Sequence, residues 1–334
     1  METRPLDAFD DEQMRAFYDV SWRAEMEDGR PWNGHWTFEE LADQLRTPSG
    51  DHRLDGVAAY DGETLVGAGV IGRSLHTNLD KAWVFPMVDP PCRRRGAGSA
   101  LLEALVETAR ADGRTTVQLS ATYAGPEDED APAMRFARKH GFHLSQTEIS
   151  RRLRLPVDDA LLDALEAEAS AHANGYTVET FTGCVPDEHL ASYCALVNLL
   201  GVDAPHGDVE QEESSLTPDT VRDDARRNEA LGREVFGALA VKGGEAVAQT
   251  DIAVQPGETG KALQWGTYVH RDHRGHRLGT AVKVANLRAL QRGRPDVRQV
   301  DTQNAETNRW MVGINERLGF EVYAVTPQFV RRLA

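Results

Sequence analysis

Short apolar runs separated by glycine-containing turns occur in the same order in both halves of the chain. In each half, the first two runs flank a pair that is typical of a hairpin turn, Asp61-Gly62 or Gly243-Gly244. Runs of this length and composition predict strands. The predicted strands are 56–60, 65–71 and 81–88 in the first half, and 234–241, 246–254 and 262–269 in the second.

A helix is predicted after the third strand of each half. In the first half, apolar residues at helical spacing share one face, and Gly113 ends the helix. Gly293 and Pro295 end its counterpart. Strands at 115–121 and 297–303 and a second, shorter helix then follow, ending at Gly141 or Gly319. Hairpins followed by strand, helix and strand predict an α/β fold of the α+β type, with a mixed sheet in each half.

Two motifs show that the halves are copies of one fold. The segment VDPPCRRRGAG (88–98) matches VHRDHRGHRLG (269–279) at its valine, one arginine and its last glycine, all at the same offset along the chain. Farther on, KHGF (139–142) matches RLGF (317–320) at nearly the same offset. We therefore expect a domain at 1–155 and a second at 175–334, joined by a linker helix within 156–174.

Composition narrows the range of partners. The 334 residues carry a net charge of −16, which disfavours nucleic acid and anionic lipid as partners. No basic, apolar leader and no long apolar run is present, so we expect neither secretion nor a membrane span. The three cysteines are odd in number and are not spaced as metal ligands. We therefore expect a reducing cytoplasm and no metal site.

The repeated glycine- and arginine-rich turns are candidate anion sites. Each turn opens a helix, whose first N–H groups have no partner within the helix and whose dipole attracts negative charge. Glycine lets the backbone approach a phosphate closely. Charge-assisted donors come from Arg93, Arg94 and Arg95 in one copy and from Arg274, His276 and Arg277 in the other.

These motifs resemble those of the GNAT (GCN5-related) N-acetyltransferases. Arg93-x-x-Gly96-x-Gly98 is similar to that family's pyrophosphate loop, and the G-F endings resemble its second motif. The likeness spans nearly the whole chain as a tandem pair, similar to actinobacterial two-domain members that include mycothiol-synthase-like proteins. It implies two acyl-CoA N-acyltransferase domains that take acetyl-CoA as acyl donor.

The resemblance also implies which residues contact the donor. In the first copy they are Met87, Val88, Arg93, Arg94, Arg95, Gly96, Ala97, Gly98 and Ser99. In the second copy they are Tyr268, Val269, Arg274, Gly275, His276, Arg277, Leu278, Gly279, Thr280, Asn304 and Asn308.

The chain departs from the family pattern at three points. Arg277 replaces the first glycine of the second loop, where it either crowds the phosphate or supplies a cation to it. Neither 81–88 nor 262–269 contains the glutamate that the family often places on its fourth strand. Ala137 and Asn315 stand where the family often has a tyrosine acid. The candidates for proton handling are therefore Glu306 and Tyr323, with Tyr123 in the first copy.

The resulting prediction is an acetyl-CoA-dependent N-acetyltransferase. It moves an acetyl group directly to the primary amine of a small molecule or peptide, with one catalytic and one degenerate copy. The aromatic segment 31–36 is a candidate acceptor wall or, alternatively, a loop that covers the core. The missing carboxylates and tyrosines leave a second hypothesis open, a non-catalytic acyl-CoA-binding sensor or scaffold.

Overall fold

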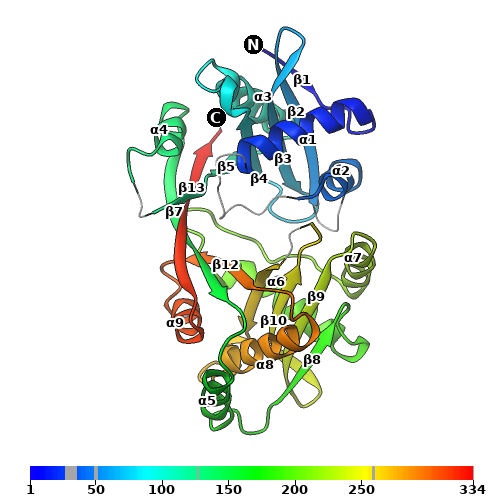
Figure 1. The fold of residues 1–334 in the computed structure, drawn as a ribbon, viewed down its shortest axis with the longest axis vertical. Coiled ribbons are helices and arrows are strands. Elements are labelled where there is room, and N and C mark those ends of the chain that lie inside the picture. The colour runs from blue at the N-terminus through cyan, green and yellow to red at the C-terminus, as the bar shows by residue number, and fades with distance from the viewer. Residues whose placement is uncertain (27–35, 49–51, 126–127, 258–259, 334) are drawn as a thin grey trace. The chain divides into compact units, whose positions relative to one another are not determined.

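The structure is a computed structural model that describes residues 1–26, 36–48, 52–125, 128–257 and 260–333 (Figure 1). The chain forms two compact units. Unit 1 consists of residues 1–148, 206–209 and 324–334, and unit 2 consists of residues 149–205 and 210–323.

In unit 1, a mixed sheet lies between helices. Its strands are β1 (Glu2–Pro5), β2 (His52–Asp61), β3 (Thr64–Ser74), β4 (Lys81–Val88), β5 (Thr116–Ser120) and β6 (Tyr123–Ala124), with the start of β7 (His143–Arg154) and the end of β13 (Glu321–Arg332). Its helices are α1 (Asp11–Met26), α2 (Phe38–Arg46), α3 (Ala97–Ala111) and α4 (Pro132–Lys139), with a 3-10 turn at Pro90–Cys92.

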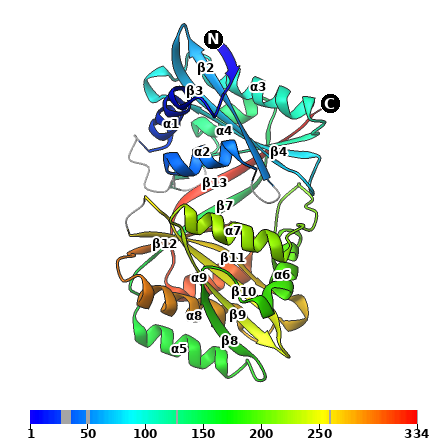
Figure 2. The same ribbon diagram turned by 90° about the vertical axis from the view of Figure 1, so that its right-hand side faces the viewer.

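The strands of unit 1 follow the order β1-β2-β3-β4-β5-β13, and the β4–β5 pair is parallel. Successive residues of a strand point to opposite faces, so each face of this sheet has its own core. Ile71 packs with Leu101 and Leu105 of α3 on one face. Val70 packs with Met14 of α1 on the other face, which α1 and α2 cover (Figure 2).

Unit 2 repeats this arrangement. Its strands are β8 (Thr177–Thr182), β9 (Glu234–Lys242), β10 (Glu245–Val254), β11 (Lys261–Val269) and β12 (Gln299–Ala305), together with the end of β7 and the start of β13. Its helices are α5 (Asp159–Ser170), α6 (Leu190–Asp203), α7 (Pro218–Ala230), α8 (Leu278–Gly293) and α9 (Arg309–Leu318), with 3-10 turns at Asp187–His189 and Arg271–His273.

The strands of unit 2 follow the order β7-β12-β11-β10-β9-β8, and the β11–β12 pair is parallel. Helix α8 packs against one face through Val282, Val284 and Leu287. Helix α6 packs against the opposite face, where Leu190 and Leu196 meet Leu239 and Tyr268. The α/β fold with a mixed sheet, predicted from the repeated pattern, is confirmed in both halves.

The predicted strands and helices are found at the expected places. The strand at 81–88 has the predicted bounds, and the other predicted strands differ from the observed ones by a few residues, whereas β1, β6, β7, β8 and β13 have no predicted counterpart. The two central helices begin at Ala97 and Leu278, two residues before Ser99 and Thr280, where the sequence predicted them to start. No helix within the described ranges is long and apolar enough to cross a lipid bilayer.

The division into units differs from the predicted boundary at residue 155. The last eleven residues, 324–334, belong to unit 1, and the end of β7 belongs to unit 2. Each half of the chain thus supplies a strand to the other unit. The predicted linker helix corresponds to α5, whose Leu162 and Leu165 are buried against Leu287 of α8. It is therefore part of the core of unit 2.

Candidate functional site

In unit 1, the fourth and fifth strands part just before the arginine-rich loop. The parallel ladder joins Lys81–Val84 of β4 to Thr116–Leu119 of β5 and ends there. Beyond this point, within the part of the chain that the structure describes, Met87 and Val88 pair with β3 alone, through Ala68 and Gly67. One backbone edge of the Met87–Val88 segment consequently has no strand partner among the described residues, and on it the Val88 carbonyl accepts only from the Arg93 side chain.

The loop of unit 1 presents backbone and charge together. Gly96, the N-cap of α3, has φ +99° and open space around it, and no side chain caps the helix. A left-handed φ of this kind favours glycine. Arg94 and Arg95 are exposed beside it, whereas Ala97 is buried. A Cβ on Gly98 would lie 3.5 Å from Val88 Cγ2, on the side where the strands part. Ser99 Oγ is 3.0 Å from His140 Nε2.

Arg93 is part of the frame of this loop. Its Nε donates to the carbonyl of Val88 at 3.2 Å, and its NH2 group donates to the carbonyl of Ala24 at 2.9 Å. The guanidinium thus links the end of β4 to α1. This geometry assigns its side chain to bracing the loop and leaves Arg94 and Arg95 as the cations that face outward.

Unit 2 has the same parted strands. The ladder between β11 and β12 joins Lys261–Leu263 to Gln299–Asp301 and ends there. Tyr268 and Val269 continue to pair with β10. The Tyr268 hydroxyl donates to Asp203 Oδ2 at 2.7 Å, and burial is the main cause that raises the pKa of Tyr268 to about 12.

The side chains of the second loop are tied to neighbouring helices. Arg274 repeats the brace, because its Nε donates to the carbonyl of Val269 and its NH2 group donates to Asp203. His276 Nδ1 is 3.0 Å from the carbonyl oxygen of His172. Arg277 stands at the N-cap of α8 with φ +54° and forms an ion pair with Glu168 of α5.

The position of Arg277 bears on whether its side chain crowds the phosphate or supplies a cation to it. Its guanidinium is held by Glu168 at the side of the loop, and the helix start again has no side-chain cap. Gly275, at φ +86°, has open space around it. Leu278, Gly279 and Thr280 are buried at the first turn, and a Cβ on Gly279 would approach Ile314 Cδ1 to 3.0 Å. The second loop is therefore the tighter of the two.

The asparagines predicted near the donor have structural partners. Asn304 Oδ1 accepts from Asn315 at 3.1 Å, and Asn315 Oδ1 accepts from Lys283 Nζ at 2.8 Å. Asn308 caps α9, since its Oδ1 accepts the Met311 N–H at 3.2 Å. These contacts hold the segment between β12 and α9 in place.

The residues predicted to move protons have different surroundings. Glu306 is exposed in the turn after β12. The Tyr323 hydroxyl donates to Asp301 at 3.3 Å, and burial is the main cause that raises its pKa. In unit 1, the Tyr123 hydroxyl accepts the N–H of Asp128 at 3.1 Å. No hydrogen bond or ion pair joins Glu306 to Tyr323 within the described part of the chain, so their roles stay predictions.

The aromatic segment 31–36 falls mainly outside the described residues. Of its six positions only Trp36 is described, as an exposed side chain. Its proposed role as an acceptor wall therefore stays a prediction.

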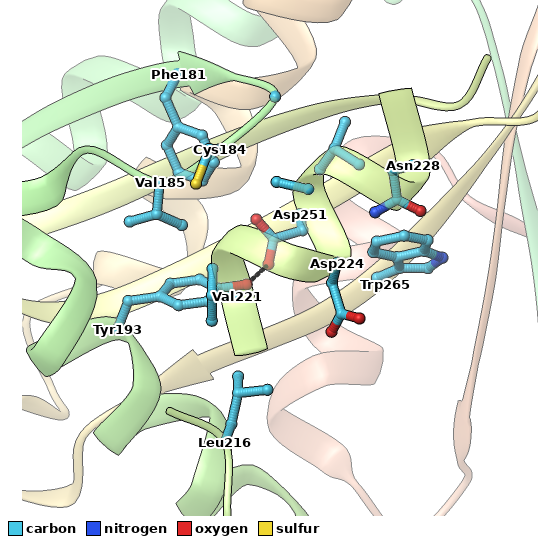
Figure 3. Close-up of a pocket in the computed structure, with 13 residues that line it drawn as sticks. Phe181, Cys184, Val185, Tyr193, Leu216, Val221, Asp224, Asn228, Asp251 and Trp265 are labelled. Carbon is cyan, nitrogen blue, oxygen red and sulfur yellow. Dashed lines mark hydrogen bonds between the residues drawn. The ribbon is translucent and has the colours of Figure 1, made fainter. Parts of the chain in front are cut away.

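Unit 2 also has a pocket that the sequence analysis did not identify. Asp251 of β10 and Tyr193 of α6 meet there, with 2.7 Å between the Tyr193 hydroxyl and Asp251 Oδ2 (Figure 3). Burial raises the pKa of Asp251 to about 7. Burial and the neighbouring carboxyl raise the pKa of Tyr193 well above its usual value. The available signal was a single acid within the apolar run 246–254.

Comparison with known proteins agrees with this geometry. Residues 11–142 match the family described as Acetyltransferase (GNAT) family. A solved tandem GNAT protein from the clavulanic acid biosynthesis pathway is 31% identical, with a TM-score of 0.78, over 99% of this chain and 98% of its own. The chain belongs to the GNAT acetyltransferase family.

Other solved structures share the fold of this GNAT chain. A GCN5-related N-acetyltransferase from Sphaerobacter thermophilus is 17% identical, with a TM-score of 0.64, over 99% of this chain and 95% of its own. The N-myristoyltransferase of Saccharomyces cerevisiae is 12% identical, with a TM-score of 0.59, over 99% and 80% of the two chains. No curated protein matches the chain.

Family membership supports acyl-CoA N-acyltransferase activity, and the loops fit an acyl-CoA donor. Open space at Gly96, the uncapped start of α3 and the exposed Arg94 and Arg95 suit a pyrophosphate in unit 1. The open edge beyond Val84 suits an extended amide-bearing arm. Within the described residues, no three His, Cys, Asp or Glu side chains are grouped so that they could hold a metal ion.

Proposed function

We propose that this GNAT protein is an acetyl-CoA-dependent N-acetyltransferase that acts on the primary amine of a small molecule or peptide. The observation that carries the proposal is the repeated geometry of the two units. In each unit the parallel ladder ends and an open strand edge leads to a helix start without a side-chain cap. Two such sites in one chain support two places for a CoA thioester.

Two sets of backbone groups are proposed to bind different parts of the donor. Backbone N–H groups at 96–99 and 277–279 are proposed to bind pyrophosphate oxygens, as at other helix N-termini, whereas the Thr280 N–H already donates to the Arg277 carbonyl at 3.1 Å. The edges at Met87–Val88 and Tyr268–Val269 are proposed to pair with the pantetheine amides, although the Val88 and Val269 carbonyls already accept from Arg93 and Arg274. When bound, the donor supplies an activated acyl thioester. The chain then has to exclude water and orient an amine, which can contribute about 7–11 kcal/mol to lowering the barrier.

Unit 2 is proposed as the catalytic copy and unit 1 as the degenerate one. Asp251 gives unit 2 a buried carboxyl group on the face covered by α6 and α7. In unit 1 the equivalent position of the repeat is Val70, which is packed among apolar side chains of α1 and α2. A carboxyl with a pKa of about 7 is suited to accept a proton from an amine near neutral pH.

Calorimetric titration of acetyl-CoA into the full chain tests the donor site, with CoA and ATP as comparison ligands. We expect a stoichiometry near two for the wild type and near one for each of the variants G98D and G279D. Neither glycine has a positive φ, so neither variant strains the backbone, but the Cβ of G279D also lies 3.0 Å from Ile314 Cδ1, where that side chain has to shift. The new carboxylate repels the pyrophosphate, which is expected to weaken binding at that site at least tenfold.

The variants G98A and G279A separate the effect of charge from that of size. A Cβ on Gly98 makes only ordinary contacts, so G98A is expected to keep two binding sites. Absence of acetyl-CoA binding to the wild-type chain would contradict the proposed function. Tight binding without turnover of any amine would favour the alternative, a non-catalytic acyl-CoA-binding module.

A further inference from the structure

A pocket of about 120 Å³ lies between the sheet of unit 2 and helices α6 and α7 (Figure 3). Asp251 of β10 and Trp265 of β11 line it from the sheet, Tyr193 lines it from α6, and Asn228 lines it from α7. At about 30 Å³ for each water molecule, the volume corresponds to about four waters. The pocket therefore suits a small head group.

Asp251 has unused hydrogen-bonding capacity in this pocket. Its side chain is buried, at 5% exposure, and Oδ2 accepts the Tyr193 hydroxyl at 2.7 Å. Oδ1 is buried as well and has no hydrogen-bond partner among the described residues. Buried polar atoms in native proteins nearly always have a partner. An unpartnered carboxyl oxygen at a pocket is therefore a place for a donor from a ligand.

The fold itself does not require an acid at this position. Val88 and Val269 are equivalent in the two units, and they pair with Gly67 and Ala248 respectively. Three residues after Gly67 on β3 is Val70, and three residues after Ala248 on β10 is Asp251. Val70 is buried in an apolar cluster with Met14 and Phe17. The equivalent strand of unit 1 thus carries an aliphatic side chain here, in a β3–β4 ladder without a register shift, and the carboxyl in unit 2 calls for a separate explanation.

The neighbouring strand brings an aromatic ring to the pocket. The β10–β11 register shifts between Thr250 and Ile252, so that Asp251 lies opposite the two residues Trp265 and Gly266. In such a bulge the extra residue redirects side chains. Trp265 is 41% exposed and lines the pocket. Its face attracts cations, and the Arg233 guanidinium already lies 5.9 Å from the ring centroid.

We propose that this pocket binds the ammonium group of a small organic cation, with Asp251 as its ion-pair partner. The ligand class is a primary ammonium on a short carbon chain, because apolar side chains such as Phe181, Leu216 and Val221 make up much of the remaining wall. The inference rests on the proposed function, for which it names the acceptor as a cationic amine. Tyr193 is the positioning residue that holds the carboxyl group through Oδ2.

The test uses n-butylammonium as the probe and n-butanol as its uncharged counterpart. Both are titrated by calorimetry into the full chain at about 0.15 M salt, which screens general attraction to the acidic surface. We expect n-butylammonium to bind the wild type at least tenfold more tightly than n-butanol does. D251N is expected to weaken n-butylammonium binding at least tenfold.

Two further variants serve as controls for this test. D251V places in unit 2 the residue that unit 1 has at the equivalent position, so it is expected to fold and to lose the preference for n-butylammonium. D61N removes an equal charge from the exposed β2–β3 turn and is expected to bind the probe as the wild type does. Equal binding by the wild type and D251N, or no binding of the ammonium to the wild type, would overturn the inference.

No CoA ester is present in these titrations, so their outcome is independent of the donor test. Probe binding without acetyl-CoA binding would keep the pocket and remove the acyltransferase proposal. Acetyl-CoA binding without probe binding would keep the acyltransferase proposal and overturn the proposed ammonium pocket.

Discussion

At the scale of single residues, the two units differ in what fills equivalent buried positions. By the offset that relates the two glycine-rich loops, Val70 and Leu102 of unit 1 correspond to Asp251 and Lys283 of unit 2. All four side chains are buried. Burial of an ionisable group disfavours its charged form, so each polar replacement lowers the stability of the folded state at a pH where the group is charged.

The loss of folded-state stability caused by burying a charged group can be measured at Lys283. Its ammonium donates to Asn315 at 2.8 Å, and burial lowers its pKa to about 7. In the unfolded chain a lysine has a pKa of about 10.4. Between these values the unfolded state binds more protons, so the wild-type free energy of unfolding rises with pH, by up to about 5 kcal/mol.

The variant K283L is expected to remove this rise. Its stability relative to the wild type is therefore greatest near about pH 7 and declines toward about pH 10. Lost hydrogen bonding to Asn315 adds a constant offset that does not depend on pH. Urea unfolding between these pH values measures the effect, and K139L, at an exposed lysine, is the control. Parallel pH profiles for K283L and the wild type would contradict the account.

At the scale of elements, local patterns predicted the central strands and helices of each half, but not the strands β7 and β13 or how the two units share them. The turn pairs Asp61-Gly62 and Gly243-Gly244 and the glycine-ended helices specify local structure. The apolar pattern of β13 does not reveal its neighbour. In the structure its end pairs with β5 of unit 1, through Gln328–Arg332 and Thr116–Ser120. Such pairing is decided by the tertiary fold.

This exchange predicts where two core substitutions act. Phe329 is 2% exposed in the core of unit 1, although it lies near the C-terminus. Leu153 is 3% exposed in the core of unit 2, although it lies in the first half of the chain. Truncation of such a side chain to alanine costs about 2–5 kcal/mol.

Amide hydrogen exchange shows which unit each of the two substitutions destabilises. F329A is expected to speed exchange in β4 and α3 of unit 1, and L153A in β11 and α8 of unit 2. A simple boundary at residue 155 predicts the opposite assignment. Faster exchange of α8 rather than α3 in F329A would show that β13 does not complete unit 1.

At the scale of the whole molecule, the chain combines two copies of the GNAT fold with unequal sites. The sequence predicted the family and both loops, because spacing and glycines are local properties. It did not predict that Arg93 and Arg274 brace their loops or that Glu168 holds Arg277. The Tyr193–Asp251 pair joins residues 58 positions apart, and only the folded sheet brings them together.

The central claim is that unit 2 carries out acetyl transfer. The most direct measurement is release of the CoA thiol from acetyl-CoA, over a panel of primary amines that includes n-butylamine, by the wild type, G98D and G279D. We expect turnover by the wild type, a loss of at least a hundredfold in G279D and less than fivefold in G98D. A greater loss in G98D than in G279D would place catalysis in unit 1, and no turnover of any amine by the wild type would contradict the claim altogether.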